Sequence, residues 1–396
     1  MYRHFRILGV ELGLLGPEAL IEPILRAYRR FSIAAPSDRN GCISIEFRES
    51  RNEAVVSGRV IPLVPGLDPA SQLHQHFQRA MLDALDGVAV LHAAALLDRA
   101  GRALVIGAPS RHGKSLLALE LACRGFGFMS DDYAPLDLER RLVLPYPRAV
   151  GIRPTAEAPI PEPFRPPVDA PEHETLAGKR LQDVGDVLGE SALARDPAPL
   201  GHVVLLSASD AEPEPPTIVR LATRTAEAPA LDDLFSRTPG VEILKRADAP
   251  GLRSWSLRLD HRRHPSPAIS AVLDSDGVVQ MGTSRGRPPD FTAGPRAVRL
   301  PRRAAAMLLA RELLNRGARS RLLANYGGDA AGIFVDLAAA LRDTPCWRVR
   351  AGEIVETATL IEKIVASDRP ARPPSGVSGK PAGATRTARR RNTARS

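Results

Sequence analysis

Residues 107–115, with the sequence GAPSRHGKS, have the composition of a loop that binds phosphate. The segment 102–106 before it is apolar and partly β-branched, which is typical of a buried parallel strand. The segment after it has apolar residues at helical spacing and ends at Gly125. Backbone N–H groups at the N-terminus of such a helix converge on anions, and the helix dipole favours negative charge there. The segment therefore predicts a site for the phosphates of a nucleotide.

The residues of this loop have separate expected roles. Gly113 lets the backbone approach the ligand, Lys114 reaches the β- and γ-phosphates of ATP, and Ser115 offers its hydroxyl to Mg²⁺. The usual spacing is G-x-x-x-x-G-K-S/T, but here Ala108 stands five residues before Gly113 and Gly107 comes one place earlier. Either Ala108 takes the first glycine position or the loop is one residue longer. The predicted nucleotide-binding residues are Ala108, Pro109, Ser110, Arg111, His112, Gly113, Lys114, Ser115 and Leu116.

An acidic pair, Asp131 and Asp132, lies sixteen and seventeen residues after Ser115. Phe126, Phe128 and their neighbours predict a buried strand that carries the pair at its carboxyl end, where ligands bind in doubly wound sheets. A carboxylate there can hold Mg²⁺ or accept the proton of an attacking hydroxyl. The sequence Ser-Asp-Asp is also typical of a turn. The neighbouring phosphate loop favours the functional interpretation.

Together these motifs resemble HPr kinase/phosphorylase, and more closely the broad group of HPr-kinase-related proteins. The resemblance rests on LHAAA at 91–95, on the run KSLLALELACRGFGFMSDD and on the number of residues from Lys114 to Asp132, and it covers about residues 85–150. It implies an α/β fold: a P-loop HPr-kinase-like core with a mixed sheet, a small N-terminal α/β region and C-terminal helices.

The resemblance also implies roles for individual residues. Lys114 and Ser115 bind phosphate and Mg²⁺, and Asp131 joins Ser115 at the metal. Either Asp131 or Asp132, with Asp132 preferred, accepts the proton of the acceptor hydroxyl, so the predicted catalytic residues are Asp132, Asp131, His92 and Lys114. His92 would lie close to the transferring phosphoryl group, although a histidine in an apolar strand is more often a satisfied core residue. The family uses a further glutamate for metal, for which Glu157 is one candidate among several carboxylates. The family's downstream glycine-rich stretch is not recognisable, so HPr itself is not predicted as the substrate.

Composition restricts the partners and the compartment. The chain has 396 residues, a hydrophobic content of 44% that supports a real core, and a net charge of +9. Eight Lys or Arg and one Asp fall after residue 366, so the rest of the chain carries only about +2, and we do not expect nucleic-acid binding. The three cysteines lack CxxC spacing, and no apolar run approaches the length of a membrane span. These features indicate a cytoplasmic protein without a membrane partner, and leave its oligomeric state open.

The chain divides into three predicted parts. Residues 1–75 form a small N-terminal α/β region, residues 76–366 form the P-loop domain with an insertion or extended loops at 208–297, and residues 367–396 form a disordered basic tail. The proline-dense stretch 151–171 is expected to be a surface loop. The other expected elements are helices at 17–28, 69–85, 301–316, 333–341 and 354–365, strands at 43–47, 54–64, 88–97, 102–106, 126–130 and 202–207, two short strands within 133–145, and an edge strand at 346–349.

Two functions fit these residues. The first is an ATP- and Mg²⁺-dependent kinase that phosphorylates a hydroxyl of a protein serine or a small molecule, because phosphoryl transfer needs little beyond positioning and charge neutralisation. The alternative is a nucleotide-binding regulatory or scaffold protein with a degenerate loop and no turnover. Ala108 and the bulky Arg111-His112 favour the alternative, and the retention of Lys114, Ser115 and both aspartates favours the kinase.

Overall fold

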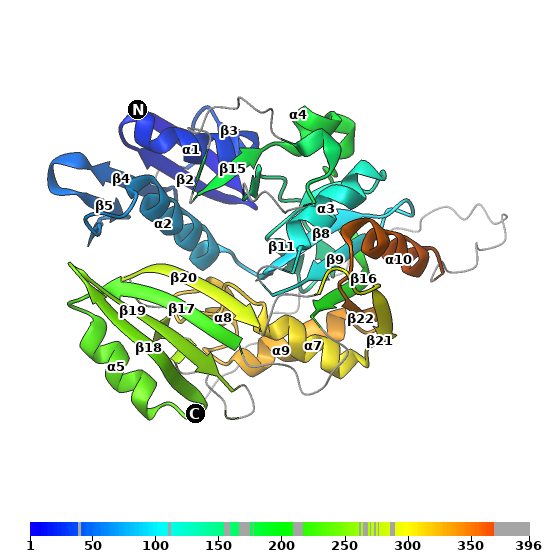
Figure 1. Cartoon of the computed structure of the whole chain (residues 1–396). Coiled ribbons are helices and arrows are strands. Elements are labelled where there is room, and N and C mark those ends of the chain that lie inside the picture. Colours follow the sequence, from blue (N-terminus) through cyan, green and yellow to red (C-terminus); the bar gives the residue numbers. More distant parts are fainter. Residues whose placement is uncertain are drawn as a thin grey trace, which may run out of the picture.

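The computed structural model gives a mixed α/β protein (Figure 1). It describes residues 1–38, 41–109, 112–153, 159–165, 175–176, 178–208, 217–260, 263, 268–269, 271–272, 275, 277–285 and 290–367. Ser110, Arg111 and Glu157 of the predicted site lie outside the described residues, as does the tail from residue 368. Within the described ranges, no helix combines the length and the apolar character that crossing a bilayer requires.

The N-terminal residues form a six-stranded sheet in the order β3-β1-β2-β4-β5-β6, against which α1 and α2 pack (Figure 1). Residues 54–64, expected as one strand, instead form a hairpin, because Ser57 and Gly58 both have positive φ and make a tight two-residue turn. Helix α2 begins after Asp68, whose carboxylate accepts hydrogen bonds from the backbone N–H groups of Ala70 and Ser71. The elements are β1 (Tyr2–Ile7), β2 (Val10–Leu15), α1 (Glu18–Tyr28), β3 (Ser32–Ile33), β4 (Ile43–Arg48), β5 (Glu53–Val56), β6 (Arg59–Pro62) and α2 (Pro69–Ala84).

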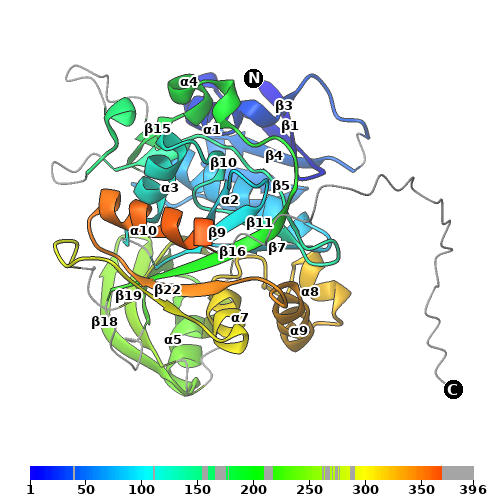
Figure 2. The same cartoon turned by 90° about the vertical axis from the view of Figure 1, so that its right-hand side faces the viewer.

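A nine-stranded mixed sheet forms the centre of the molecule, in the order β10-β8-β9-β16-β12-β11-β7, with β22 beside β16 and β21 beside β22. Helices α3 and α10 cover one face, and α7, α8 and α9 cover the other (Figure 2). The strands are β7 (Val88–Leu91), β8 (Ala93–Leu97), β9 (Ala103–Gly107), β10 (Gly127–Ser130), β11 (Ala134–Asp137), β12 (Leu142–Val143), β16 (Ala198–Ser207), β21 (Arg296–Arg299) and β22 (Cys346–Arg350). The helices are α3 (Lys114–Cys123), α7 (Arg302–Arg311), α8 (Arg321–Asn325), α9 (Ala330–Ala340) and α10 (Ile354–Ser367).

Strand directions in this sheet bring three chain segments to one edge. Strand β8 is antiparallel to both β9 and β10, so β9 and β10 run in the same direction. The carboxyl ends of β9 and β10 and the start of β8 therefore meet at one edge of the sheet. These three ends carry the phosphate loop, the acidic pair and His92, respectively.

Three sequence expectations for this sheet were wrong. The strand expected at 88–97 is two strands, β7 and β8, separated by His92, whose backbone N–H donates to the carbonyl of Glu312 at 2.7 Å. The helix expected at 301–316 ends at Arg311, because the following residues turn to hydrogen-bond with β7, among them Leu314 to Val90 at 2.8 Å. Strand β22, expected at an edge, is paired on both sides, with β16 and with β21.

Residues 217–285 form a four-stranded antiparallel sheet in the order β18-β19-β17-β20. Helix α5 (Ala228–Arg237) packs on it through Phe235, whose ring meets that of Trp255 edge-on at 5.6 Å. The region that the sequence left as an insertion or extended loops thus contains a sheet with its own apolar core. Its strands are β17 (Thr217–Arg224), β18 (Val241–Ala249), β19 (Leu252–Leu259) and β20 (Val278–Arg285).

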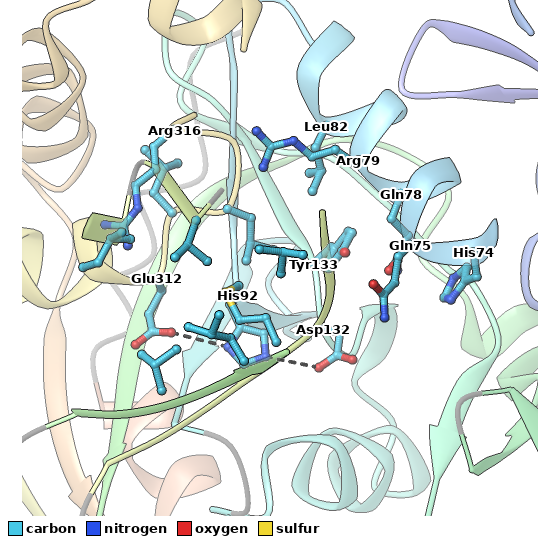
Figure 3. A pocket seen from close by; sticks show the side chains of 18 of the residues that line it. His74, Gln75, Gln78, Arg79, Leu82, His92, Asp132, Tyr133, Glu312 and Arg316 are labelled. Carbon is cyan, nitrogen blue, oxygen red and sulfur yellow. Dashed lines mark ion pairs between the residues drawn. The ribbon is translucent and has the colours of Figure 1, made fainter. Parts of the chain in front are cut away.

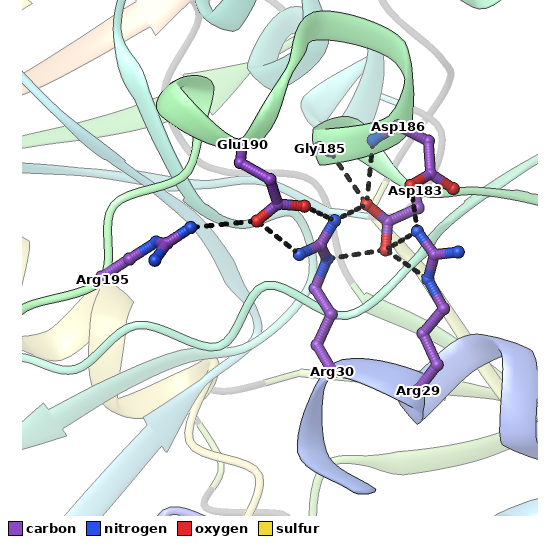
Figure 4. Close-up of polar contacts among 7 residues, drawn as sticks. All are labelled: Arg29, Arg30, Asp183, Gly185, Asp186, Glu190 and Arg195. Carbon is purple, nitrogen blue, oxygen red and sulfur yellow. Dashed lines mark hydrogen bonds and ion pairs between the residues drawn. The ribbon is translucent and has the colours of Figure 1, made fainter.

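A small three-stranded sheet, β13-β15-β14, lies beside the N-terminal region (Figure 1). Its strands are β13 (Val150–Ile152), β14 (Thr175–Leu176) and β15 (Lys179–Gln182), so the stretch expected as a proline-rich surface loop begins as a strand and also buries Phe164 completely. Arg30, just after α1, donates to Asp183 at 2.7 Å and to Glu190 (Figure 4). Asp183 also caps α4 (Val184–Leu188), so this ion-pair network fixes the N-terminal region to the chain after β15.

Candidate functional site

The phosphate loop connects β9 to α3. Strand β9 ends at Gly107, so the buried Ala108 is the first residue of the loop. Gly113 is the residue before the helix and has a φ of +79°, a backbone conformation that favours glycine over residues with a Cβ. His112 is buried, while Pro109 reaches the surface of a cavity described below.

Two side chains at the start of α3 contact the acidic pair at the end of β10. Lys114 Nζ lies 3.1 Å from Asp132 Oδ1, an ion pair that lacks hydrogen-bond geometry. Ser115 Oγ donates to Asp131 Oδ2 at 3.2 Å. Lys114 and Asp131 are almost fully buried, with exposed fractions of 6% and 1%. The loop and the acidic pair, identified separately in the sequence, therefore lie together.

His92 lies between two carboxylates (Figure 3). Its Nε2 is 3.7 Å from Asp132 Oδ1, and its Nδ1 is 3.4 Å from Glu312 Oε2. Sequence reasoning missed Glu312, because it was expected inside a longer helix. No sequence signal distinguishes Glu312 from a solvent-facing residue of such a helix.

Two further cations that the sequence did not single out surround Asp132. Arg148 Nη2 donates to Asp132 Oδ2 at 3.0 Å and lies 4.0 Å from Asp131 Oδ1. Lys179 Nζ, on β15, lies 4.0 Å from Asp132 Oδ2. The Arg148 guanidinium also stacks over the ring of Tyr133, 5.6 Å from its centroid. Both residues come from outside the β9–β10 unit, so motif spacing could not reveal them.

These contacts shift the pKa values of the two aspartates in opposite directions. Burial raises the pKa of Asp131, and the adjacent charge of Asp132 raises it further. Burial also opposes the ionisation of Asp132, but Lys114, His92 and Arg148 outweigh it and hold the pKa of that carboxyl well below its usual range. For His92, burial and the Lys114 charge oppose protonation, but contacts with Asp132 and Glu312 outweigh both and raise the pKa of the imidazole.

Ser115 and Asp131 form a set of oxygen atoms that fits Mg²⁺. Asp131 Oδ1 is buried and makes no hydrogen bond to the described residues, and Arg148 Nη2 lies 4.0 Å from it, so this oxygen can still accept a metal ion. Among those same residues, no group of three or more His, Cys, Asp or Glu could hold a metal alone. Mg²⁺ commonly binds through one or two protein oxygens together with phosphate oxygens and water, so this small set suits a nucleotide-bound metal.

A cavity of about 600 Å³ adjoins His92 and Asp132 (Figure 3). Helix α2 lines one side, through residues including Gln75, Gln78 and Arg79, and the segment 311–316 lines another. Strands of the four-stranded sheet also line the cavity. Asp132 therefore contacts Lys114 at the end of the predicted phosphate loop on one side and lines a cavity large enough for a small molecule on the other.

No protein-family model matches the chain, and no curated protein matches it. Among solved structures, the HPr(Ser) kinase/phosphatase from Coxiella burnetii is similar, with 20% sequence identity over 31% of this chain and 69% of that chain and a TM-score of 0.23. A TM-score this low carries no argument, so the HPr-kinase-like core remains a prediction.

Proposed function

We propose that the protein is an ATP- and Mg²⁺-dependent phosphotransferase with a P-loop, HPr-kinase-like core, which phosphorylates a hydroxyl group. The observation that supports this most strongly is the 3.1 Å contact between the Lys114 ammonium and the Asp132 carboxylate. It joins a phosphate-binding cation at the start of α3 to a candidate base at the end of β10, the next strand along the chain. Ser115 and Asp131 lie beside this contact with the oxygens that Mg²⁺ requires.

The transfer would use few protein groups. The N-terminus of α3 and Lys114 bind the β- and γ-phosphates, and Ser115 and Asp131 hold Mg²⁺, which neutralises phosphate charge when bound. The acceptor oxygen forms a bond to the γ-phosphorus while the bond from that phosphorus to the β–γ bridging oxygen breaks, and ADP leaves. Asp132 accepts the proton of the acceptor hydroxyl.

The ligand-free contacts suggest how Asp132 becomes an effective base. Lys114 is the strongest of the interactions that lower its pKa, and a carboxylate with a very low pKa accepts protons poorly. Bound phosphates compete with Asp132 for Lys114, because both are anions within reach of one ammonium group. Nucleotide binding is therefore expected to raise the pKa of Asp132 towards its ordinary value at the moment when transfer requires it.

The alternative, a nucleotide-binding regulatory protein without turnover, is supported by a different contact. Arg148 donates to Asp132 at 3.0 Å independently of the phosphate loop, and it would keep this carboxylate a weak base even after Lys114 moves to the phosphates. Ala108 at the start of the loop is also consistent with reduced phosphate binding. ATP binding without hydrolysis or transfer would support this alternative.

Calorimetric titration of ATP, with and without Mg²⁺, tests the proposal. The wild type is expected to bind ATP in the micromolar range only with Mg²⁺, and Lys114→Ala is expected to lose this binding. Lys363→Ala removes an exposed lysine of α10 and should bind like the wild type, which controls for the change in net charge. No binding by the wild type would refute both the kinase and the regulatory alternative. Transfer of labelled phosphate, absent in Asp132→Asn, separates these two.

A further inference from the structure

The cavity beside Asp132 carries more positive charge than phosphoryl transfer requires. Two carboxylates, those of Asp132 and Glu312, line it among the described residues. Six cationic side chains line it as well: Arg79, Arg148, Arg153, Lys179, Arg311 and Arg316. Asp83 pairs with Arg79 from outside the lining, so three carboxylates stand against six cations. Of these, Arg148 and Lys179 lie within 4.0 Å of Asp132 and belong to the site of transfer. The excess of cations favours a ligand that is itself an anion.

The charged groups lie at two ends of the cavity. In Figure 3, Asp132 and His92 occupy one end, and Arg79 of α2 and Arg316 lie on opposite walls towards the other. Arg79 pairs with Asp83 at 3.0 Å, and Arg316 donates to the carbonyl of Ala310 at 3.5 Å. These contacts hold the two guanidinium groups in place. They therefore form a fixed pair of cations at a distance from the candidate base, where an anionic group of the ligand would be bound.

Apolar side chains supply much of the remaining lining. They come from α2, as Leu82, and from the four-stranded sheet, as Val219, Leu221, Leu257 and Met281. The sheet therefore has two roles, because the same apolar residues that form its own core also line a cavity at the transfer site. An acceptor that spans this cavity would bury hydrocarbon between its two polar ends.

We infer that this cavity binds the phosphoacceptor, and that the acceptor is a small amphipathic anion. Its hydroxyl group lies at Asp132, its apolar body lies against the four-stranded sheet, and its carboxylate or phosphate group lies at Arg79 and Arg316. The inference depends on the proposed function for the transfer step, in which the hydroxyl proton goes to Asp132 and ADP is the leaving group. Binding of the acceptor itself does not depend on nucleotide and can be measured separately.

Binding of defined probes tests the inference directly. Terminally hydroxylated butanoate, octanoate and dodecanoate would be titrated calorimetrically into the full-length protein below their micellar concentrations, without nucleotide. Affinity is expected to rise about fourfold for each added methylene until the cavity is filled. The methyl ester of each acid keeps the hydrocarbon and loses the charge, so it is expected to bind about tenfold more weakly than the acid. Esters that bind as well as the acids would overturn the inference, as would failure of all the acids to bind.

Matched variants locate the probe in the cavity. Arg79→Gln and Arg316→Gln, on opposite walls, should each weaken binding of hydroxyoctanoate about tenfold, whereas Arg303→Gln on the exposed face of α7 should not. Met281→Glu adds a carboxylate to the cavity at a residue that is 44% exposed, and it should also weaken binding. Met307→Glu makes the same change at an exposed residue outside the lining and should have no effect. Equal effects of a cavity variant and its control would refute the assigned position.

Measuring ATP binding beside hydroxy-acid binding distinguishes a failure of this inference from a failure of the proposed function. If ATP and Mg²⁺ bind but no hydroxy acid does, the proposed function stands and the inference is wrong. If a hydroxy acid binds in the cavity and ATP does not bind, the proposed function is wrong. If both bind, the γ-phosphate of labelled ATP should appear on the hydroxy acid with the wild type and not with Asp132→Asn. If the bound acid never becomes labelled while ATP is consumed, the inference is also wrong.

Discussion

Replacing Asp132 by asparagine is expected to destabilise the ligand-free protein and to strengthen nucleotide binding. The carboxylate lies 3.1 Å from Lys114 Nζ and 3.0 Å from Arg148 Nη2, and both cations have side chains that are less than 10% exposed. At an effective dielectric constant of about 20, a charge pair at 3.1 Å interacts by roughly 5 kcal/mol before desolvation is counted. The substitution keeps the shape of the side chain and removes the charge that compensates both cations.

The expected loss in the free energy of unfolding is about 3 kcal/mol, at the lower end of the range for breaking a buried ion pair, because asparagine still accepts a hydrogen bond. For a chain of this size the loss corresponds to a decrease in Tm of roughly 4 °C. ATP supplies a new anion for Lys114. Because Asp132→Asn has no Lys114–Asp132 pair to give up, it should bind ATP about tenfold more tightly than the wild type.

Thermal unfolding and calorimetry of the two proteins, with and without ATP and Mg²⁺, check both parts. Without ATP, the variant should have a lower Tm than the wild type. Saturating ATP should raise the Tm of the variant by more than that of the wild type. Asp186→Asn is the control, since Asp186 pairs with Arg29 at a site where both side chains are about half exposed, and its loss should change stability by no more than about 0.5 kcal/mol. A ligand-free Asp132→Asn protein as stable as the wild type would refute the claim that Asp132 compensates the two buried cations.

Three further predictions follow from the contacts described above. Glu312→Gln should lower the pKa of His92, measured by NMR titration of the ring, because contacts with Asp132 and Glu312 are what raise it; an unchanged pKa would show that Asp132 alone is responsible. Gly113→Ala should weaken ATP binding and cost about 1 kcal/mol of stability, because alanine is strained at a φ of +79°, and equal Tm and affinity would contradict this. For Asp183, burial opposes ionisation, but Arg30 and Arg29 outweigh it and lower the pKa of the carboxyl. The stabilisation that this carboxylate contributes is therefore complete above the ordinary aspartate pKa, and it disappears as the pH falls through the lowered value. The difference in stability between the wild type and Asp183→Asn should therefore shrink in acid, and a constant difference would argue against the ionic contribution.

The parts of the site that could be predicted from the sequence lie in one short unit of the chain. Lys114, Ser115, Asp131 and Asp132 belong to consecutive elements, β9, α3 and β10, joined by short connections. Local patterns specify a strand, a loop and a helix, and a short connection returns the chain to the same sheet. His92 is included through the family resemblance. It lies near Asp132 in the structure because it precedes β8, which pairs with both β9 and β10.

The parts that could not be predicted depend on contacts between distant segments. Helical periodicity continues through Leu313, but α7 does not continue. Instead the backbone N–H of Leu314 donates to Val90 of β7, and the carbonyl of Glu312 accepts from His92. Asn315 is the clearest case, since its side chain bonds to the backbone of both Val88 and Val90 and is almost fully buried. A pattern of apolar residues indicates which face of a helix or strand is buried. It does not indicate which neighbouring segment forms hydrogen bonds with the backbone at the end of that element.

Residues that sequence reasoning missed add to the charges around the candidate base, beside the predicted Lys114 and His92. Arg148 and Lys179 contact Asp132 directly, and Glu312 acts on it through His92. Phosphate-loop residues and an acidic pair specify where a nucleotide and a metal would bind, since those roles need only local geometry. Whether Asp132 then works as a base depends on the balance between these distant charges and the phosphates, because each added cation makes the carboxylate a weaker proton acceptor. Under the proposed function, Arg148 and Glu312, which lie outside the predicted nucleotide motif, therefore contribute to the difference between a kinase and a nucleotide-binding protein without turnover.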